Sequence, residues 1–136
     1  MSITYLASGS ILNYNFGGAV ACDYTPPTNY YVGLSTTHIS NSGSNATPPV
    51  GYGYARVVIT NDKATTFGLA SSGCLVNKAV ITFPVSSGSW GTILDVYLAD
   101  SASSIWYFQA LATPTVVQSG TTISFAASAI AISMTN

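Results

Sequence analysis

Short apolar segments alternate with clusters of Gly, Pro, Ser and Asn from residue 30 almost to the end of the chain. The segments are rich in Val, Ile, Thr, Tyr and Phe, which favour strands, and the clusters between them favour turns. Their spacing is close to the roughly 8 to 12 residues that are typical of a β-sandwich or barrel. The predicted strands are 30–35, 52–60, 75–83, 90–99, 104–112, 115–118, 121–125 and 129–134.

The N-terminal segment has a different pattern. Apolar residues recur there at three- to four-residue spacing, at Ile3, Leu6, Ala7 and Ile11. This spacing predicts a short helix with one apolar face, capped by Ser2 and ended by Gly17 and Gly18. Because the segment also contains Ser, Thr and Gly residues that are poor helix formers, an extended arm remains the alternative.

The pattern as a whole predicts a single domain that spans residues 1–136. A chain of this length is large enough to bury one core but not two. We expect a mainly β fold, an antiparallel and jelly-roll-like β-sandwich of about eight short strands. The helix or arm would occupy residues 1–25, and the sandwich would form the body, residues 26–136.

Two predicted strands carry apolar residues on faces that a simple sandwich would leave exposed. Segment 104–112 is apolar on both faces, so it is either central between two layers or covered by a neighbouring subunit. In segment 90–99, one face is expected to be core and the other an interface. Strict alternation there places Leu94, Val96 and Leu98 on the first face and Ile93, Asp95 and Tyr97 on the second.

Charged residues are scarce. The chain has three basic and four acidic side chains, one histidine and 5% charged residues, against about a quarter in an ordinary globular protein. Nucleic-acid binding is not expected, because it needs clustered basic residues and Arg56, Lys63 and Lys78 are scattered. Membrane insertion is not expected either, because the apolar runs are shorter than the roughly 20 residues that a helix needs to span a bilayer. Such a surface suits burial by other protein.

Candidate chemistry is sparse. His38 lies in the long polar loop 36–50 beside several hydroxyls, but without a nearby acid in sequence it is expected to be a solvated side chain and not a general base. The carboxylates are too dispersed for calcium, and zinc spacing and nucleotide fingerprints are absent from the sequence, so we expect neither an enzyme nor a cofactor. Cys22 and Cys74 could form a disulfide, but two separate buried thiols are the favoured expectation. A loop as long as 36–50 is usually functional or mobile.

The order of several segments resembles a family of small tailed-bacteriophage virion proteins, labelled tail-fibre-like or head-decoration proteins. The resemblance covers nearly the whole chain and rests on the collinear series SITYLASGSILNYNFGG, YYVGLST, GYARVV, AVITFP, WGT, LATP and SGTTISFAASAI. It implies a short N-terminal helix on a β-rich body and a structural role without catalytic residues.

The leading hypothesis is a capsid decoration (cement) protein. It would be made in the host cytoplasm, form a homotrimer and bind the major capsid protein on the phage head surface. The alternative is a tail or head fibre module whose loop 36–50 contacts host surface glycans. The residues expected at the assembly interface are Tyr5, Leu6, Ile11, Tyr97, Trp106 and Phe108.

Overall fold

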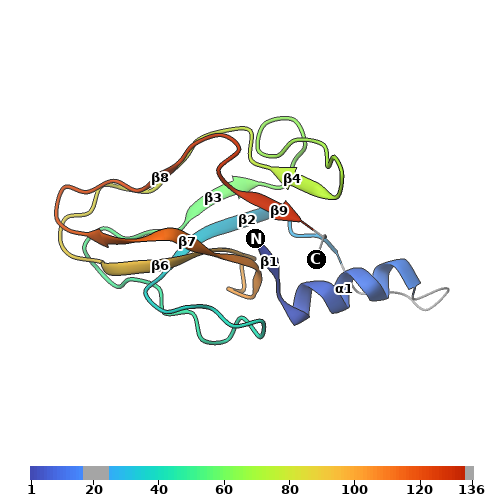
Figure 1. The fold of residues 1–136 in the computed structure, drawn as a ribbon, viewed down its shortest axis with the longest axis horizontal. Helices are drawn as coiled ribbons and strands as arrows, with labels where there is room; N and C mark the ends of the chain where they lie inside the picture. Colours follow the sequence, from blue (N-terminus) through green and yellow to red (C-terminus); the bar gives the residue numbers. More distant parts are fainter. Residues whose placement is uncertain (17–24, 134–136) are drawn as a thin grey trace.

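The computed structural model describes residues 1–16 and 25–133, and Figure 1 shows the arrangement of their helix and strands. Strand pairing is antiparallel throughout these residues, so the mainly β class and the N-terminal helix are confirmed. The elements are β1 (Ser2–Ile3), α1 (Tyr5–Phe16), β2 (Asn29–Ser35), β3 (Val57–Thr60), β4 (Cys74–Val76), β5 (Ile81–Thr82), β6 (Gly91–Ala99), β7 (Ile105–Val117), β8 (Ser124–Phe125) and β9 (Ala131–Ser133).

One five-stranded sheet and two short ribbons form the body. The sheet has the order β1-β7-β6-β2-β3, and the ribbons are the pairs β4-β9 and β5-β8. The main hydrophobic core joins the two parts: Val32, Leu34 and Leu98 of the sheet belong to the same buried cluster as Ile81 of β5 and Ile130 beside β9. Burying one such aliphatic side chain stabilises the fold by about 1.5–3 kcal/mol, which holds the ribbons on the sheet although each has few strand hydrogen bonds.

The predicted faces of segment 90–99 are partly wrong. The pairing of β6 with β7 shifts register between Ile93 and Asp95. Ile93 is fully buried in the main core together with Val96 and Leu98, whereas Asp95 and Tyr97 lie on the opposite face of the sheet. A register irregularity of this kind re-aims a side chain, and strict alternation cannot anticipate it. The predicted strands 104–112 and 115–118 belong to one strand, β7, and this irregularity in its pairing with β6 lies between them.

The predicted strand 75–83 is interrupted by Asn77. This side chain is completely buried, and its Nδ2 donates to the carbonyl oxygens of Ala79 (2.8 Å) and Ala126 (2.9 Å). Its Oδ1 accepts from the backbone N–H of Ile130 at 2.8 Å. The β4–β9 ladder ends at Val76, and Asn77 forms an isolated backbone bridge with Phe67. The buried amide supplies the hydrogen bonds in the gap between β4 and β5.

The N-terminal helix begins later than predicted, and Ser2 does not cap it. Ser2 pairs in β1 with Phe108 of β7. The cap is Thr4, whose fully buried Oγ1 accepts from the backbone N–H of Ala7 at 3.3 Å and donates to the carbonyl oxygen of Ile105 at 2.8 Å. The predicted helix stop at Gly17 and Gly18 lies outside the described residues, as does Cys22. Among the described residues, no helix is long and apolar enough to cross a membrane.

Candidate functional site

The long loop 36–50 lies over the outer face of the sheet. Ile39 of the loop is buried and forms a second hydrophobic cluster with four sheet residues. This cover explains why segment 104–112 is apolar on both faces: one face meets the main core, and the other meets the loop of the same chain. The four sheet residues of this cluster are Tyr97, Ala99, Ile105 and Phe108.

Hydrogen bonds hold the loop in one shape. The hydroxyl of Ser35, at the end of β2, accepts from the backbone N–H of Thr47 at 3.0 Å, and the N–H of Thr36 donates to the Thr47 carbonyl oxygen at 2.9 Å. The Asn45 side chain accepts from the N–H of Ser40 at 2.8 Å and also donates to the carbonyl oxygen of His38. The two ends and the tip of the loop are therefore tied together, and the loop forms a fixed wall on the sheet.

The expectation that no acid orients His38 is wrong. Its Nδ1 lies 2.8 Å from Oδ1 of Asp95, and Oδ2 of Asp95 accepts from the backbone N–H of Ile39 at 2.7 Å. Asp95 is 2% exposed whereas the His38 side chain is 69% exposed. The two residues are far apart in sequence, but Asp95 pairs directly with Ser35 at the start of the loop.

The carboxylate of Asp95 fastens the loop to the sheet. Orienting an imidazole with a carboxylate is one part of a catalytic triad, but a triad also needs a nucleophile at the other ring nitrogen. Among residues 1–16 and 25–133, no hydroxyl or thiol bonds to Nε2 of His38. The bonds that the structure shows for Asp95 join the loop to β6.

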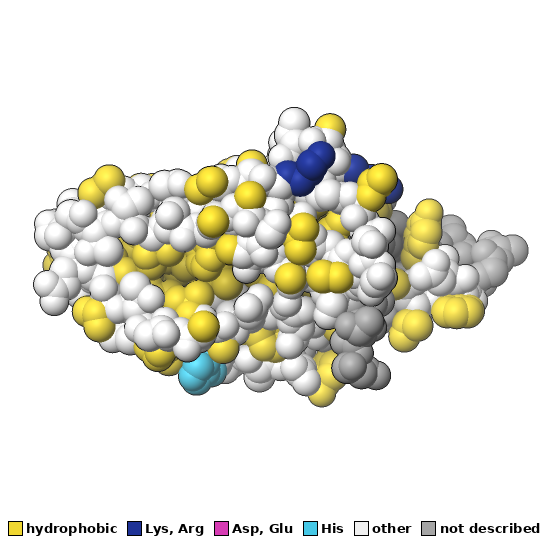
Figure 2. Space-filling model, turned by 45° about the horizontal axis from the view of Figure 1, so that its top comes forward, with side chains coloured by type: hydrophobic (Ala, Val, Ile, Leu, Met, Phe, Trp, Pro, Cys, Tyr) yellow, Lys and Arg dark blue, Asp and Glu magenta, His cyan; other side chains and the backbone are white. Residues whose placement is uncertain are grey.

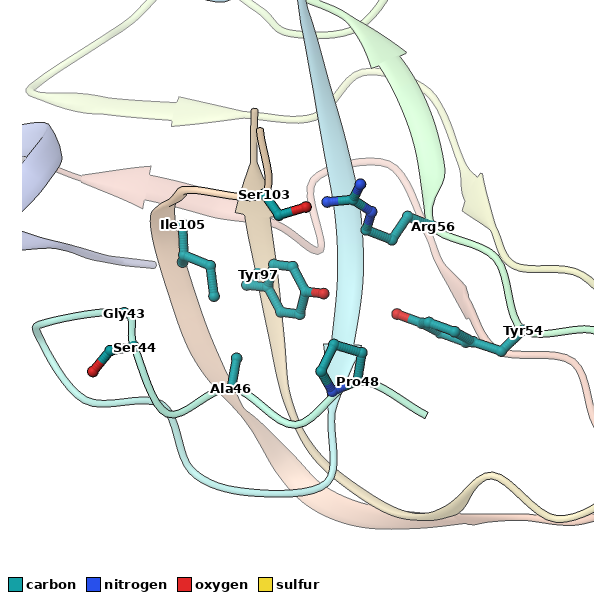
Figure 3. Close-up of a pocket in the computed structure, with 9 residues that line it drawn as sticks. All are labelled: Gly43, Ser44, Ala46, Pro48, Tyr54, Arg56, Tyr97, Ser103 and Ile105. Atoms are coloured by element: carbon teal, nitrogen blue, oxygen red, sulfur yellow. The ribbon is translucent and has the colours of Figure 1, made fainter. Parts of the chain in front are cut away.

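A surface pocket of about 510 Å³ opens between the loop and the outer face of the sheet. Figure 3 shows its polar groups turned toward one another: the Arg56 guanidinium, the hydroxyl of Ser103 and the hydroxyls of Tyr54 and Tyr97. Pro48 and Ile105 contribute apolar wall. We call this site the loop pocket.

Arg56 is the cation of the loop pocket. Its guanidinium lies 4.8 Å from the ring centroid of Tyr31, in a cation–π contact. The ion pair found in the described part of the chain joins His38 to Asp95, and no described carboxylate lies within ion-pair distance of Arg56. The charge therefore faces the pocket without an acidic partner from those residues.

The two tyrosine hydroxyls of the loop pocket stay protonated. Burial raises the pKa of Tyr54 far above its usual 10, and burial likewise raises the pKa of Tyr97. The backbone N–H of Leu34 donates to the Tyr54 hydroxyl at 2.9 Å. Both hydroxyls are consequently neutral at physiological pH.

A family model described as podophage GP4 fiber I protein gp80 matches residues 2–133. The chain belongs to the gp80 family. The resemblance to phage virion proteins is thereby confirmed, and the family is one of structural fibre proteins, not a class of enzymes. This gp80-family chain is accordingly a phage virion component. No curated protein matches it.

The structure does not bring the six predicted interface residues of this gp80-family chain onto one surface. Tyr5 and Leu6 are 70% and 46% exposed on α1, and Ile11 is half-buried on the same helix. The other three are largely buried within the chain itself, although Tyr97 also lines the loop pocket. These three are Tyr97, Trp106 and Phe108.

Helix α1 carries further exposed apolar residues that the sequence pattern missed. Leu12 is 56% exposed and Phe16 is 82% exposed, and both lie off the face that the three- to four-residue spacing selected. Ala7 is the buried residue of the helix. In Figure 2, hydrophobic side chains stand out at the end of the molecule that carries α1. A count of apolar residues around the whole helix, instead of along one face, would have found them.

Proposed function

We propose that this gp80-family chain is a structural module of a virion fibre, and that it joins copies of itself through helix α1. The observation that carries the proposal is the exposure of large apolar side chains on this helix. They are Tyr5, Leu6, Leu12 and Phe16.

Burial of these side chains against another copy would be favourable. Removing one large apolar side chain from water contributes about 1.5–3 kcal/mol, and a contiguous exposed apolar patch is typical of an interaction surface. Helix α1 lies at one end of the molecule in Figure 1, where a neighbouring copy can reach it. The chain has a formal net charge of −1, so copies repel one another only weakly.

A homotrimer is the assembly that we propose, because a closed cyclic arrangement buries the same patch in every copy. Sedimentation velocity of the purified chain tests it. The wild type should sediment as an oligomer, and Leu12→Ser with Phe16→Ser should sediment as a monomer that keeps the wild-type circular dichroism spectrum.

The matched control removes two exposed apolar side chains from loops of the body, Val50 and Leu69, which are 88% and 76% exposed. Val50→Ser with Leu69→Ser should leave the oligomer intact. A wild-type chain that stays monomeric at high concentration would contradict the proposal, and so would a double variant in α1 that sediments like the wild type.

The second candidate is a capsid decoration protein, in which α1 would dock on the major capsid protein. The scarcity of charge and the same exposed helix favour it. An averaged image of the intact particle separates the two roles. Density for this chain in a fibre supports the first proposal, and density repeated over the head lattice supports decoration.

A further inference from the structure

The loop pocket contains an arrangement of donors that the assembly surface on α1 does not use. Figure 3 shows the Arg56 guanidinium and the Ser103 hydroxyl on one side and the hydroxyls of Tyr54 and Tyr97 facing them. A guanidinium presents only donors, and it forms paired hydrogen bonds with a planar group that has two acceptor oxygens. The pocket therefore suits a ligand that brings acceptors.

The charge of the pocket suits a ligand with one negative charge. Among the described residues, Arg56 is the one basic residue that lines the pocket. Lys78 donates instead to the carbonyl oxygen of Ala64 at 3.0 Å, and Lys63 is exposed in the turn next to Ala64. A phosphate monoester carries about −1.5 to −2 at neutral pH and would leave part of its charge unmatched. One carboxylate matches both the charge and the forked geometry of a single arginine.

The groups that line the pocket are held in place before any ligand arrives. The Arg56 guanidinium lies over the ring of Tyr31, and the ring of Tyr97 packs against the backbone of Gly33. Ser103 has a φ of 69° and lies in a tight turn in which its N–H donates to the carbonyl oxygen of Asp100 at 3.1 Å. Fixed donors lose little freedom on binding, which favours affinity.

The remaining lining suits a hydroxylated ring. Tyrosine and serine hydroxyls can both donate and accept hydrogen bonds, as a sugar hydroxyl can. The pocket has more hydroxyls than a carboxylate alone would bind. Pro48 and Ile105 offer apolar surface for the C–H face of a ring. The volume of about 510 Å³ lies within the range of small-molecule sites.

We propose that the loop pocket binds a saccharide unit that carries one carboxylate, with Arg56 pairing with the carboxylate and Ser103 and Tyr97 binding ring hydroxyls. Its use in host contact rests on the proposed fibre role, but binding itself is a property of the free chain. Loss of assembly through α1 and loss of binding in the pocket are therefore separate outcomes.

The test is a titration of the labelled chain, followed by amide chemical shifts, with four probes: glucuronate, glucose, glucose 6-phosphate and glucose 6-sulfate. Glucuronate should give saturable shifts at residues that line the pocket and bind about tenfold or more tightly than glucose, because hydrogen bonds to a charged group are the stronger ones. Equal binding of glucose, stronger binding of either 6-substituted sugar, or no saturable shift with glucuronate would overturn the proposal.

Two variants locate the binding. Arg56→Gln should reduce glucuronate binding to the level of glucose, whereas Lys63→Gln removes the same charge outside the pocket and should change binding by less than about twofold. Ser103→Gly keeps the positive φ and deletes the hydroxyl, so it tests the pocket even if Arg56→Gln perturbs the fold. It should weaken binding severalfold, and wild-type affinity in either pocket variant, once folded, would overturn the assignment.

Discussion

The ring of Tyr97 covers Gly33 on the outer face of the sheet. The two residues are direct cross-strand partners in β2 and β6. A Cβ atom at Gly33 would collide with Cζ and the hydroxyl oxygen of Tyr97, so the ring occupies the space that any other residue at position 33 would need. This close approach places the phenol hydroxyl at the loop pocket, and it makes the glycine a requirement of packing.

Gly33→Ala is therefore expected to destabilise the protein. The added methyl group must displace a buried ring, and overpacking of this kind typically costs about 1–3 kcal/mol. Urea denaturation measures the loss. Gly9→Ala is the control, because a Cβ there has nothing within 4 Å and helix propensity favours alanine by about 0.5–1 kcal/mol. Equal stability changes in the two variants would mean that Tyr97 moves aside without cost.

Asp95→Ala should release the loop from the sheet. It removes the acceptor of the Ile39 N–H, and loss of a hydrogen bond to a buried charged group typically costs about 1.5–3 kcal/mol. His38→Ala is the control: His38 is largely exposed, and its removal leaves the Ile39 bond intact, so we expect a smaller cost than for Asp95→Ala. Hydrogen exchange at the Ile39 amide should speed up in Asp95→Ala alone. Exchange that is unchanged in Asp95→Ala would show that the loop is held by other contacts.

The strands that the sequence predicted best are those determined by local pattern. Segments 30–35 and 90–99 agree with β2 and β6 to within a residue at either end, because alternating β-branched and aromatic residues between turn clusters define them. The divided segment 75–83 shows the limit. Asn77 bonds to Ala126 and Ile130, which lie far from it in the sequence. The residues around Asn77 therefore give no sign of these partners.

The candidate site was predicted only in part for the same reason. The loop 36–50 stands out in the sequence as long and polar, and it does form one wall of the pocket. In the sequence Arg56 is one of three scattered basic residues, and its place beside the loop depends on the pairing of β2 with β3. Asp95 reaches His38 because β6 pairs with β2, a contact between segments that are distant in sequence.

Asn77→Asp should strongly destabilise the body, although the two side chains have the same shape. The carboxylate cannot donate to the carbonyl oxygens of Ala79 and Ala126, and it places a buried charge beside them. Removing one partner from a buried polar network costs about 1–3 kcal/mol per unsatisfied group, and more when a charge is left. Asn61→Asp is the matched control, since its single bond to the Pro27 carbonyl oxygen is exposed. A similar fall in the urea midpoint for both variants would contradict this role.

Thr4→Val tests the observed helix cap against the predicted one. The change keeps the shape of the side chain but removes the hydroxyl that joins α1 to β7, with an expected cost of about 1–2 kcal/mol. Ser2→Ala removes the hydroxyl that the sequence pattern suggested, and we expect a change within about 0.5 kcal/mol because the residue is exposed. Thermal unfolding followed by circular dichroism compares them. A larger loss of stability in Ser2→Ala than in Thr4→Val would show that Ser2, and not Thr4, caps the helix.

Stability should fall at acid pH in a way that depends on Asp62. The Thr65 side chain donates to Asp62 at 2.7 Å, and this bond, followed by the Thr65 backbone N–H, lowers the pKa of Asp62 from 3.8 to about 2. A carboxyl whose folded pKa is depressed stabilises the fold fully above its unfolded pKa, and this contribution disappears as the pH falls from about 3.8 to about 2.

The carboxyl titration of Asp62, followed by nuclear magnetic resonance, measures this pKa directly. Thr65→Val removes the hydroxyl donor and should move the midpoint up toward 3.8, while Thr66→Val removes a hydroxyl that does not bond to Asp62 and should leave the midpoint near 2. The urea midpoint of the wild type should exceed that of Asp62→Asn at about pH 6. The two midpoints should converge as the pH falls to about 2 and below, because the wild-type carboxylate becomes protonated there. If the wild type keeps a higher urea midpoint than Asp62→Asn below about pH 2, Asp62 stabilises the fold through its shape and not through its charge.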